Sequence, residues 1–398
     1  MESYLNVSSV IVTGPRWTFD VKADRAWRIV IPKEQIDDLH LRLDNVRWPD
    51  AETVDDWSQG VPLSDLRNLA HYWRHSYDWR RCEDWLNAAG QHRARIDGLD
   101  IHFLHIRSHH DDALPLLLSH GWPGSVIEFR GVIDCLTNPE LDGGDPKDAF
   151  HLVIPSLPGF GFSGKPTAPG WGTERIASAW EELMAQLGYD RFVAQGGDWG
   201  AAITTALGVR AHPALIGLHT NMPLVLTQDL PEKLSIEEAE MLADLQAYQE
   251  QEMGYSAQQT TRPQTLAYAL ADSPVGQAAW IYEKLKSWSD CEGDPSKVFS
   301  LDAMLDNIMM YWLTNSAASS ARLYWESFTD GFGARKIGLP VGCSIFPKEL
   351  YRAPRSWADA CMSNLVHWNI LDKGGHFAAF EQPAIFTAEM RNCFRSMR

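Results

Sequence analysis

Midway along the chain stands the sequence Gly196-Gly197-Asp198-Trp199-Gly200. A short apolar run that is typical of a buried strand, residues 192–194, precedes it, and a helix-forming stretch follows it. A nucleophile on a sharp strand-to-helix turn needs small neighbours, so the motif indicates a nucleophile elbow with aspartate in the place of serine. The N-terminus of the following helix would keep the Asp198 carboxylate ionised. Taken alone, the motif would favour a tight turn in which Asp198 caps the helix.

The sequence around this motif alternates between strand and helix patterns. Residues 93–106 alternate like a hairpin, and residues 114–118 and 152–154 are short apolar runs that end in Gly/Pro turns. Residues 173–187 form an amphipathic helical pattern. Strands that alternate with helices predict a mostly parallel sheet with helices on both faces.

The whole chain divides into four expected regions. Residues 1–92 form a tryptophan-rich N-terminal region packed on the core, with a helix expected to begin with Ser64 as its N-cap. Residues 93–223 hold the first half of the sheet, and residues 331–398 hold the second half. Residues 224–330 lack strand patterns and predict a helical lid above the carboxyl ends of the strands. The predicted fold class is α/β.

A second motif, His120-Gly121-Trp122-Pro123-Gly124, follows the strand at residues 114–118. A loop at this position can supply backbone donors, and the N–H groups of Trp122 and Trp199 are expected to form an oxyanion hole. Each such donor is worth about 3 kcal/mol in a transition state. We expect His120 itself to brace the loop.

A general base and its acid partner are expected late in the chain. His376 lies on the glycine-rich turn after the last strand, whereas the rival His367 lies inside that strand. Glu349 follows the preceding strand and is the expected acid, and the other position for an acid, Asn221, carries no charge. The order Asp198, Glu349, His376 is that of nucleophile, acid and base in hydrolases with a nucleophile elbow.

Composition limits the partners. The chain of 398 residues has 35 basic and 52 acidic residues, a net charge of −17, which disfavours nucleic acid and anionic membranes and favours a small apolar ligand. Six scattered cysteines predict reduced thiols and a cytoplasmic location. Neither a signal peptide nor a run of about 18 apolar residues is expected.

Together these motifs resemble the epoxide hydrolases of the α/β-hydrolase superfamily, of the microsomal and fungal soluble type, over nearly the whole chain. The resemblance rests on Trp27-Arg28-Ile29, Arg47-Trp48-Pro49, residues 120–125, 196–200 and 261–265, Tyr311-Trp312 and residues 374–377. It implies that the region of residues 1–92 contains the N-terminal meander of that family. Two departures are expected: residues 1 to about 24 extend beyond the shared meander, and no microsomal membrane anchor is expected.

The resemblance also implies a reaction. Tyr255 and Tyr324 would be the paired lid tyrosines that bind the epoxide oxygen, although the lid also offers Tyr248, Tyr268, Tyr282 and Tyr311. Asp198 would open the ring as a covalent ester, which a water activated by His376 and Glu349 would hydrolyse to a vicinal diol. The substrates are then a small apolar epoxide and water, and neither a cofactor nor a metal is expected.

Two other functions stay open at this point. A haloalkane dehalogenase uses the same kind of nucleophile but would need indole or amide N–H donors, such as those of Trp122 and Trp199, in place of the lid phenols. A non-catalytic scaffold would keep the pocket and lack turnover. The sequence is compatible with a monomer or a homodimer, and with detoxification or secondary metabolism.

Overall fold

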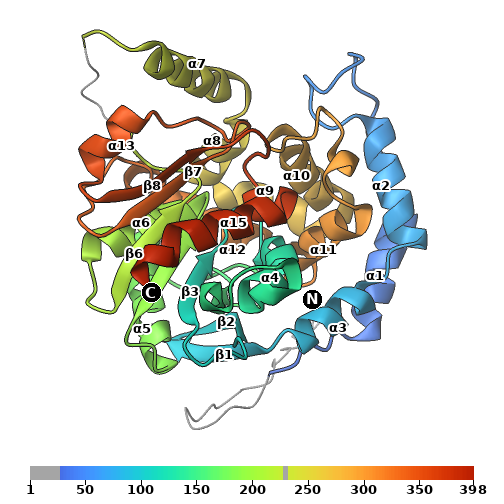
Figure 1. Ribbon diagram of the computed structural model, residues 1–398. Helices are drawn as coiled ribbons and strands as arrows, with labels where there is room; N and C mark the ends of the chain where they lie inside the picture. Colours follow the sequence, from blue (N-terminus) through green and yellow to red (C-terminus); the bar gives the residue numbers. More distant parts are fainter. Residues whose placement is uncertain (1–26, 227–231) are drawn as a thin grey trace, which may run out of the picture.

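The computed structural model describes residues 27–226 and 232–398, and its centre is one sheet of eight strands (Figure 1). The strands are β1 (Gln91–Ile96), β2 (Leu99–Ile106), β3 (Leu114–Ser119), β4 (Phe150–Pro155), β5 (Phe192–Gly196), β6 (Leu215–Thr220), β7 (Val341–Ile345) and β8 (Leu365–Ile370). Their order in the sheet is β1-β2-β4-β3-β5-β6-β7-β8. Strands β1, β2 and β4 pair antiparallel and all other pairs are parallel, so the predicted α/β class is confirmed.

The helices cover both faces of the sheet. Parallel connections are right-handed, so connections that run in opposite directions along the sheet place their helices on opposite faces. The chain moves one way through α5 (Thr173–Gln186) and α6 (Trp199–Arg210), and the opposite way through α4 (Ile133–Thr137). Helix α15 (Pro383–Phe394) lies on the same face as α4, in front of the sheet in Figure 1. The core strands β3, β4 and β5 are therefore buried on both sides.

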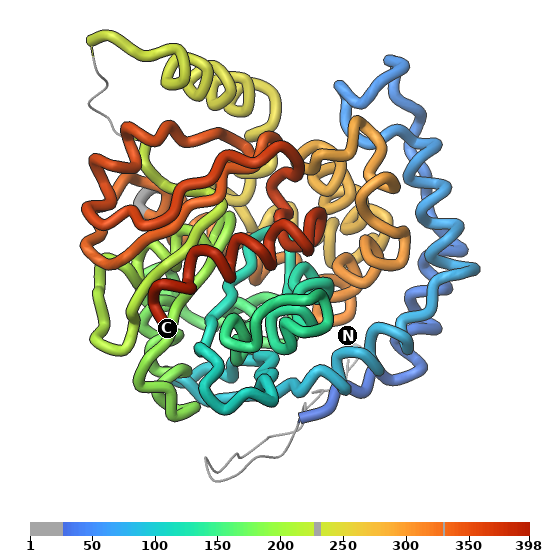
Figure 2. The backbone as a smooth tube through the Cα atoms, viewed as in Figure 1, coloured from blue at the N-terminus to red at the C-terminus, as the bar shows by residue number. Residues whose placement is uncertain are grey.

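A long helical excursion separates β6 from β7. It consists of α7 (Ile236–Gln251), α8 (Gly254–Thr261), α9 (Pro263–Asp272), α10 (Pro274–Ser287), α11 (Leu301–Trp312) and α12 (Ala317–Gly331). In Figure 2 most of this segment, gold to orange, lies between the blue N-terminal helices and the red C-terminal strands. We propose that the lid spans residues 224–330, between core halves at 93–223 and 331–398, with the N-terminal region at 1–92.

The N-terminal helices α1 (Lys33–Asp44), α2 (Leu63–His75) and α3 (Trp79–Ala88) pack on the outer side of α10 and α11 (Figure 1). Asp306 of α11 anchors them, since its buried carboxylate accepts hydrogen bonds from Tyr77 (2.8 Å) and Arg81 (2.8 Å) and from Arg130 of the core (3.1 Å). The lid, the N-terminal region and the core therefore meet at one buried carboxylate.

The remaining elements are short. They are η1 (Val126–Val132), η2 (Pro139–Asp142), η3 (Pro146–Asp148), η4 (Pro295–Lys297), α13 (Arg355–Cys361), α14 (Ala378–Glu381) and η5 (Arg395–Met397). No helix among the described residues has the length and apolar character needed to cross a membrane.

One sequence expectation about the N-terminal region is wrong. Helix α2 begins at Leu63 with Pro62 as N-cap, because the fixed backbone of Pro62 starts the helix without a side-chain cap. The Ser64 hydroxyl, which we expected to cap the helix, instead donates to Asp65 at 3.3 Å. The extension at residues 1 to about 24 lies outside the described residues.

Candidate active site

Asp198 sits between β5 and α6 in a backbone conformation that is rare for a residue with a side chain, with φ of 50° and ψ of −127°. The glycines around it are required by close backbone approaches. A Cβ on Gly196 would lie 2.1 Å from the Gly200 oxygen, and a Cβ on Gly200 would lie 2.0 Å from the Ser119 oxygen. The turn therefore has the sharp geometry of a nucleophile elbow, and it presents Asp198 at the carboxyl edge of the sheet.

The loop after β3 reaches the same carboxylate. The backbone N–H of Trp122 donates to Asp198 Oδ1 at 2.8 Å, and a Cβ on Gly121 would lie 2.2 Å from that oxygen. Trp199 is the first residue of α6, so its N–H has no acceptor within the helix. Both expected oxyanion donors thus flank Asp198, and the N–H of Trp122 is hydrogen-bonded to its carboxylate.

His120 lies behind this loop. Its Nε2 accepts from the Leu157 N–H at 3.2 Å, so Nδ1 carries the proton and donates to the Gly121 oxygen at 2.9 Å. Burial lowers the pKa of His120 to about 4, which keeps the ring neutral. His120 therefore braces the loop rather than exchanging protons.

The lid holds the same loop from the other side. Asn307 of α11 donates to the Pro123 oxygen at 2.8 Å, and the Tyr311 hydroxyl donates to the Gly124 oxygen at 2.7 Å. Tyr311 was one of the lid tyrosines that could have bound the epoxide oxygen according to the sequence. Its hydroxyl instead holds the loop, so Tyr311 has a structural role. The lid fixes the position of the donors that point at Asp198.

His376 lies after β8 and contacts two carboxylates. Its Nδ1 is 2.5 Å from Glu349 Oε1 and its Nε2 is 3.4 Å from Asp198 Oδ2. Burial alone would lower the pKa of His376, but the charges of Glu349 and Asp198 outweigh it and hold the pKa well above the usual value. The three residues therefore form a connected Asp–His–Glu set in the fold.

Asn221, at the end of β6, contributes to this set although it carries no charge. Its side chain accepts from Gln195 at 3.0 Å and donates to Glu349 Oε2 at 3.3 Å. The amide thus orients the carboxylate that orients His376. From the sequence, Asn221 was considered only as a position at which an acid could have stood. Asn221 and Glu349 are 128 residues apart, so no local pattern indicated their contact.

The rival histidine is elsewhere. His367 points from β8 toward α15, where its Nε2 lies 2.7 Å from Glu389 Oε2. The structure therefore brings His376, and not His367, to Asp198.

The two lid tyrosines expected from the resemblance face Asp198. Tyr255 of α8 and Tyr324 of α12 are 5% and 1% exposed, and both line a cavity of about 220 Å³ together with Asp198. Burial raises the pKa of both phenols well above the usual value, so both stay protonated and can donate hydrogen bonds. The ring of Tyr255 stacks on Trp122 at a centroid distance of 4.9 Å.

Of the other lid tyrosines, only Tyr248 reaches this cavity. Its hydroxyl lies 2.8 Å from that of Tyr255, a contact that the sequence did not predict. Tyr268 is 71% exposed, and the ring of Tyr282 packs against Trp57 in the N-terminal region. Tyr248 therefore lies beside the pair and is bonded to Tyr255.

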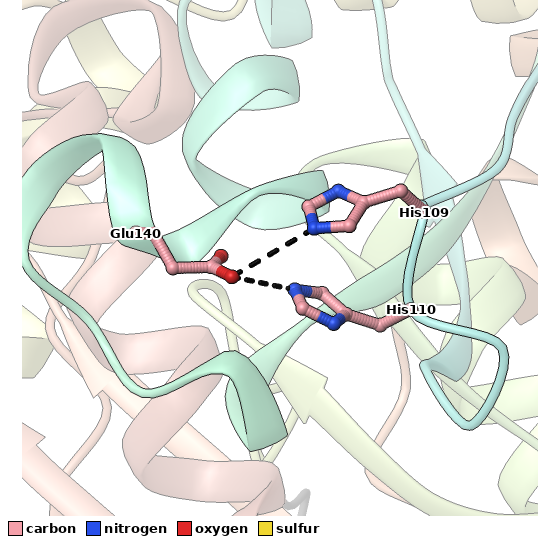
Figure 3. A group of neighbouring side chains, drawn as sticks. All are labelled: His109, His110 and Glu140. Carbon is pink, nitrogen blue, oxygen red and sulfur yellow. Dashed lines mark hydrogen bonds and ion pairs between the residues drawn. The ribbon is translucent and has the colours of Figure 1, made fainter.

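One group of described side chains has the composition of a metal site, and it lies away from Asp198. His109 and His110 precede β3, at the opposite edge of the sheet, and both point their Nε2 atoms at Glu140 Oε1 (Figure 3). The distances are 3.7 Å and 2.8 Å, and all three side chains have solvent access. A hydrogen bond from His110 to Glu140 accounts for this arrangement without an ion.

The elbow, the loop after β3 at residues 120–124, which we call the oxyanion loop, and the Asp–His–Glu set define a hydrolase of the α/β-hydrolase fold. A family profile described as "alpha/beta hydrolase fold" matches residues 115–280, and one described as "Epoxide hydrolase N terminus" matches residues 25–129. The chain belongs to the epoxide hydrolase family.

Its relatives span nearly the whole chain. A protein of Stigmatella aurantiaca named "Putative epoxide hydrolase" is 57% identical over 373 residues, which cover 94% of this chain and 85% of the relative. The structure resembles the juvenile hormone epoxide hydrolase of Bombyx mori with a TM-score of 0.86 at 31% identity, covering 94% of each chain. It resembles the Aspergillus niger epoxide hydrolase with a TM-score of 0.84 at 31% identity, covering 95% and 97% of the two chains. The protein is an enzyme of the hydrolase class.

Proposed function

We propose that the protein converts an epoxide to a vicinal diol through an ester of Asp198. The observation that carries this proposal is the position of Asp198 between two kinds of side chain. Two protonated phenols, those of Tyr255 and Tyr324, line the cavity of about 220 Å³ together with the Asp198 carboxylate, and we call this space the larger cavity. His376 contacts that carboxylate from outside the larger cavity. Such an arrangement separates ring opening from ester hydrolysis.

In the first step the phenols of Tyr255 and Tyr324 donate hydrogen bonds to the epoxide oxygen. An oxygen of Asp198 attacks a ring carbon, the ring C–O bond breaks, and one phenol gives its proton to the emerging alkoxide. An alkoxide is far more basic than a phenolate, whose pKa is near about 10, so this transfer is favourable.

In the second step His376 acts as the base. Esterification removes the negative charge of Asp198, one of the two charges that raise the pKa of His376, so the imidazole can give up its proton, which restores the phenol. The neutral His376, oriented by Glu349 and Asn221, then takes a proton from a water that attacks Cγ of Asp198. The N–H of Trp122, already bound to Asp198 Oδ1, stabilises the oxyanion.

The substrate is a small apolar epoxide. Asp198 is the one charged residue among those that line the larger cavity, and most of the others are Leu, Met, Phe and Tyr side chains. Burial of an apolar substituent against such walls favours binding. We also propose a cytoplasmic location, which the six free cysteines support.

The test is diol formation from a styrene-type epoxide, compared between the wild type and Asp198→Ala. The wild type should release diol, and Asp198→Ala should release none while its circular dichroism stays unchanged. Halide release from a haloalkane without diol formation would favour a dehalogenase. The absence of both activities in the wild type would favour a binding scaffold.

A further inference from the structure

A second, smaller cavity lies against Asp198. It offers about 20 Å³ to the centre of a water molecule, and Asp198, His376, Gly121, Gln195, Asn221 and Glu128 are among its walls. A polar cavity needs roughly 10–15 Å³ of this kind to hold one water with two or more polar partners. The small cavity thus has room for a single water.

The two cavities differ in what surrounds Asp198. The larger one has Tyr255 and Tyr324 in its wall but not His376, whereas the smaller one has His376 but no tyrosine. After ring opening the alkyl group of the ester remains in the larger, apolar cavity. A water that is to reach both Cγ of Asp198 and His376 is therefore placed best in the smaller cavity.

Glu128 is the one carboxyl group in the small cavity's wall that the proposed mechanism does not use. It lies on η1, and its carboxylate folds back over the oxyanion loop, so that a Cβ on Gly124 would lie 1.2 Å from Glu128 Oε1. Glycine at position 124 is thus what admits this carboxylate. No cation is within ion-pair distance of Glu128 among the described residues, and burial raises its pKa to about 8.

We propose that Glu128 is a positioning residue that holds the hydrolytic water in the small cavity. The inference rests on the proposed ester mechanism. One O–H of the water points at Nε2 of His376 and the other donates to the carbonyl oxygen of the Glu128 carboxyl group. A lone pair of the water then faces Cγ of Asp198.

The step is balanced without a further reactant. The water oxygen forms a bond to Cγ of Asp198 while His376 takes one proton from the water. The bond between Cγ and the ester oxygen, which came from the Asp198 carboxylate and is attached to a substrate carbon, then breaks, and His376 returns its proton to that oxygen, which completes the diol. The Asp198 carboxyl group is left protonated and gives its proton to His376, which restores the starting state. Glu128 stays protonated throughout and exchanges nothing.

Two substitutions separate the hydrogen bond from the carboxyl group. Glu128→Gln keeps a carbonyl acceptor of the same shape, whereas Glu128→Met keeps the length of the side chain and removes the acceptor. Rapid-quench mass spectrometry with excess epoxide measures the formation and decay of the alkylated enzyme in the wild type and in both variants. Thermal unfolding shows whether each variant is folded. If Glu128→Met is not folded, Glu128→Ala takes its place, and the same results are expected of it.

Loss of the acceptor should slow decay of the ester about tenfold in Glu128→Met, so that the alkylated enzyme accumulates. Alkylation should stay within about twofold of the wild type, and Glu128→Gln should keep decay within about threefold. Equal decay in the wild type and Glu128→Met would overturn the inference, as would an equal slowing of both steps. A wild type that forms no ester at all would instead contradict the proposed function.

Discussion

Removal of the phenol hydroxyls tests the tyrosine pair most sharply. Tyr255 and Tyr324 are 5% and 1% exposed, so water cannot easily replace a lost donor. A hydrogen bond to a charged oxygen is worth about 1.5–3 kcal/mol. Tyr255→Phe and Tyr324→Phe should therefore each slow alkylation about ten- to a hundredfold, and the double variant about a hundred- to ten-thousandfold if the two donors act independently.

Tyr248→Phe is the matched control. The Tyr248 hydroxyl bonds that of Tyr255 at 2.8 Å, so its loss removes a neutral hydrogen bond behind the pair. That costs about 1 kcal/mol, or less than about tenfold in rate. The difference between Tyr248→Phe and Tyr255→Phe thus separates a donor to the substrate from a donor to its neighbour.

Stopped-flow tryptophan fluorescence under single-turnover conditions can follow the alkylation step. Trp122 stacks on Tyr255 and Trp199 packs edge-on against Tyr324, with ring centroids 4.9 Å and 4.8 Å apart, so two indoles report on this cavity. Wild-type alkylation rates in the double Phe variant would refute the assignment. A loss in Tyr248→Phe as large as that in Tyr255→Phe would mean that Tyr248 itself binds the epoxide oxygen.

Three further results are expected. His376→Gln should consume about one equivalent of epoxide and then stall, with its mass raised by that of the substrate. His367→Gln should turn over normally. The reverse pattern in intact-protein mass spectra would mean that His376 is not the base. Glu349 raises the pKa of His376, and His376 must be neutral to act as the base. Glu349→Gln should therefore lower the maximum of the pH profile of kcat and shift the acid limb of that profile to lower pH. An unshifted acid limb would contradict this. Asp306→Ala should lower the free energy of unfolding in urea by about 3 kcal/mol because it leaves the buried Tyr77 hydroxyl and the half-buried guanidinium groups of Arg81 and Arg130 without their acceptor. A loss below about 1 kcal/mol would show that the anchor is unimportant.

Local patterns were enough to predict the sheet and the order of the three residues of the Asp–His–Glu set. Most strands of the parallel sheet are short apolar runs before a turn, and parallel strands bring their carboxyl ends to one edge. Asp198, Glu349 and His376 each follow such a strand, so their meeting required no knowledge of side-chain packing. The start of α2 was predicted wrongly because Ser64 looked like a cap, whereas Pro62 already fixes the first turn.

Contacts between distant segments could not be predicted in this way. The bond between Asn221 and Glu349 joins residues 128 apart, and the hydroxyl contact between Tyr248 and Tyr255 depends on how α7 meets α8. Glu128 lies on a short 3-10 helix whose sequence carries no periodic signal. Its relation to Asp198 emerges only when the oxyanion loop is folded over the nucleophile.

The origin of the oxygen in the product tests the covalent ester of Asp198 most directly. In one turnover in ¹⁸O-water, water that attacks Cγ of Asp198 leaves its oxygen on the enzyme, because the oxygen added to the substrate comes from the carboxylate. Mass spectrometry should find an unlabelled diol and, after proteolysis, ¹⁸O in the peptide that contains Asp198, while the peptide with Glu349 stays unlabelled. A diol that carries ¹⁸O in the first turnover, with no label on Asp198, would contradict the ester.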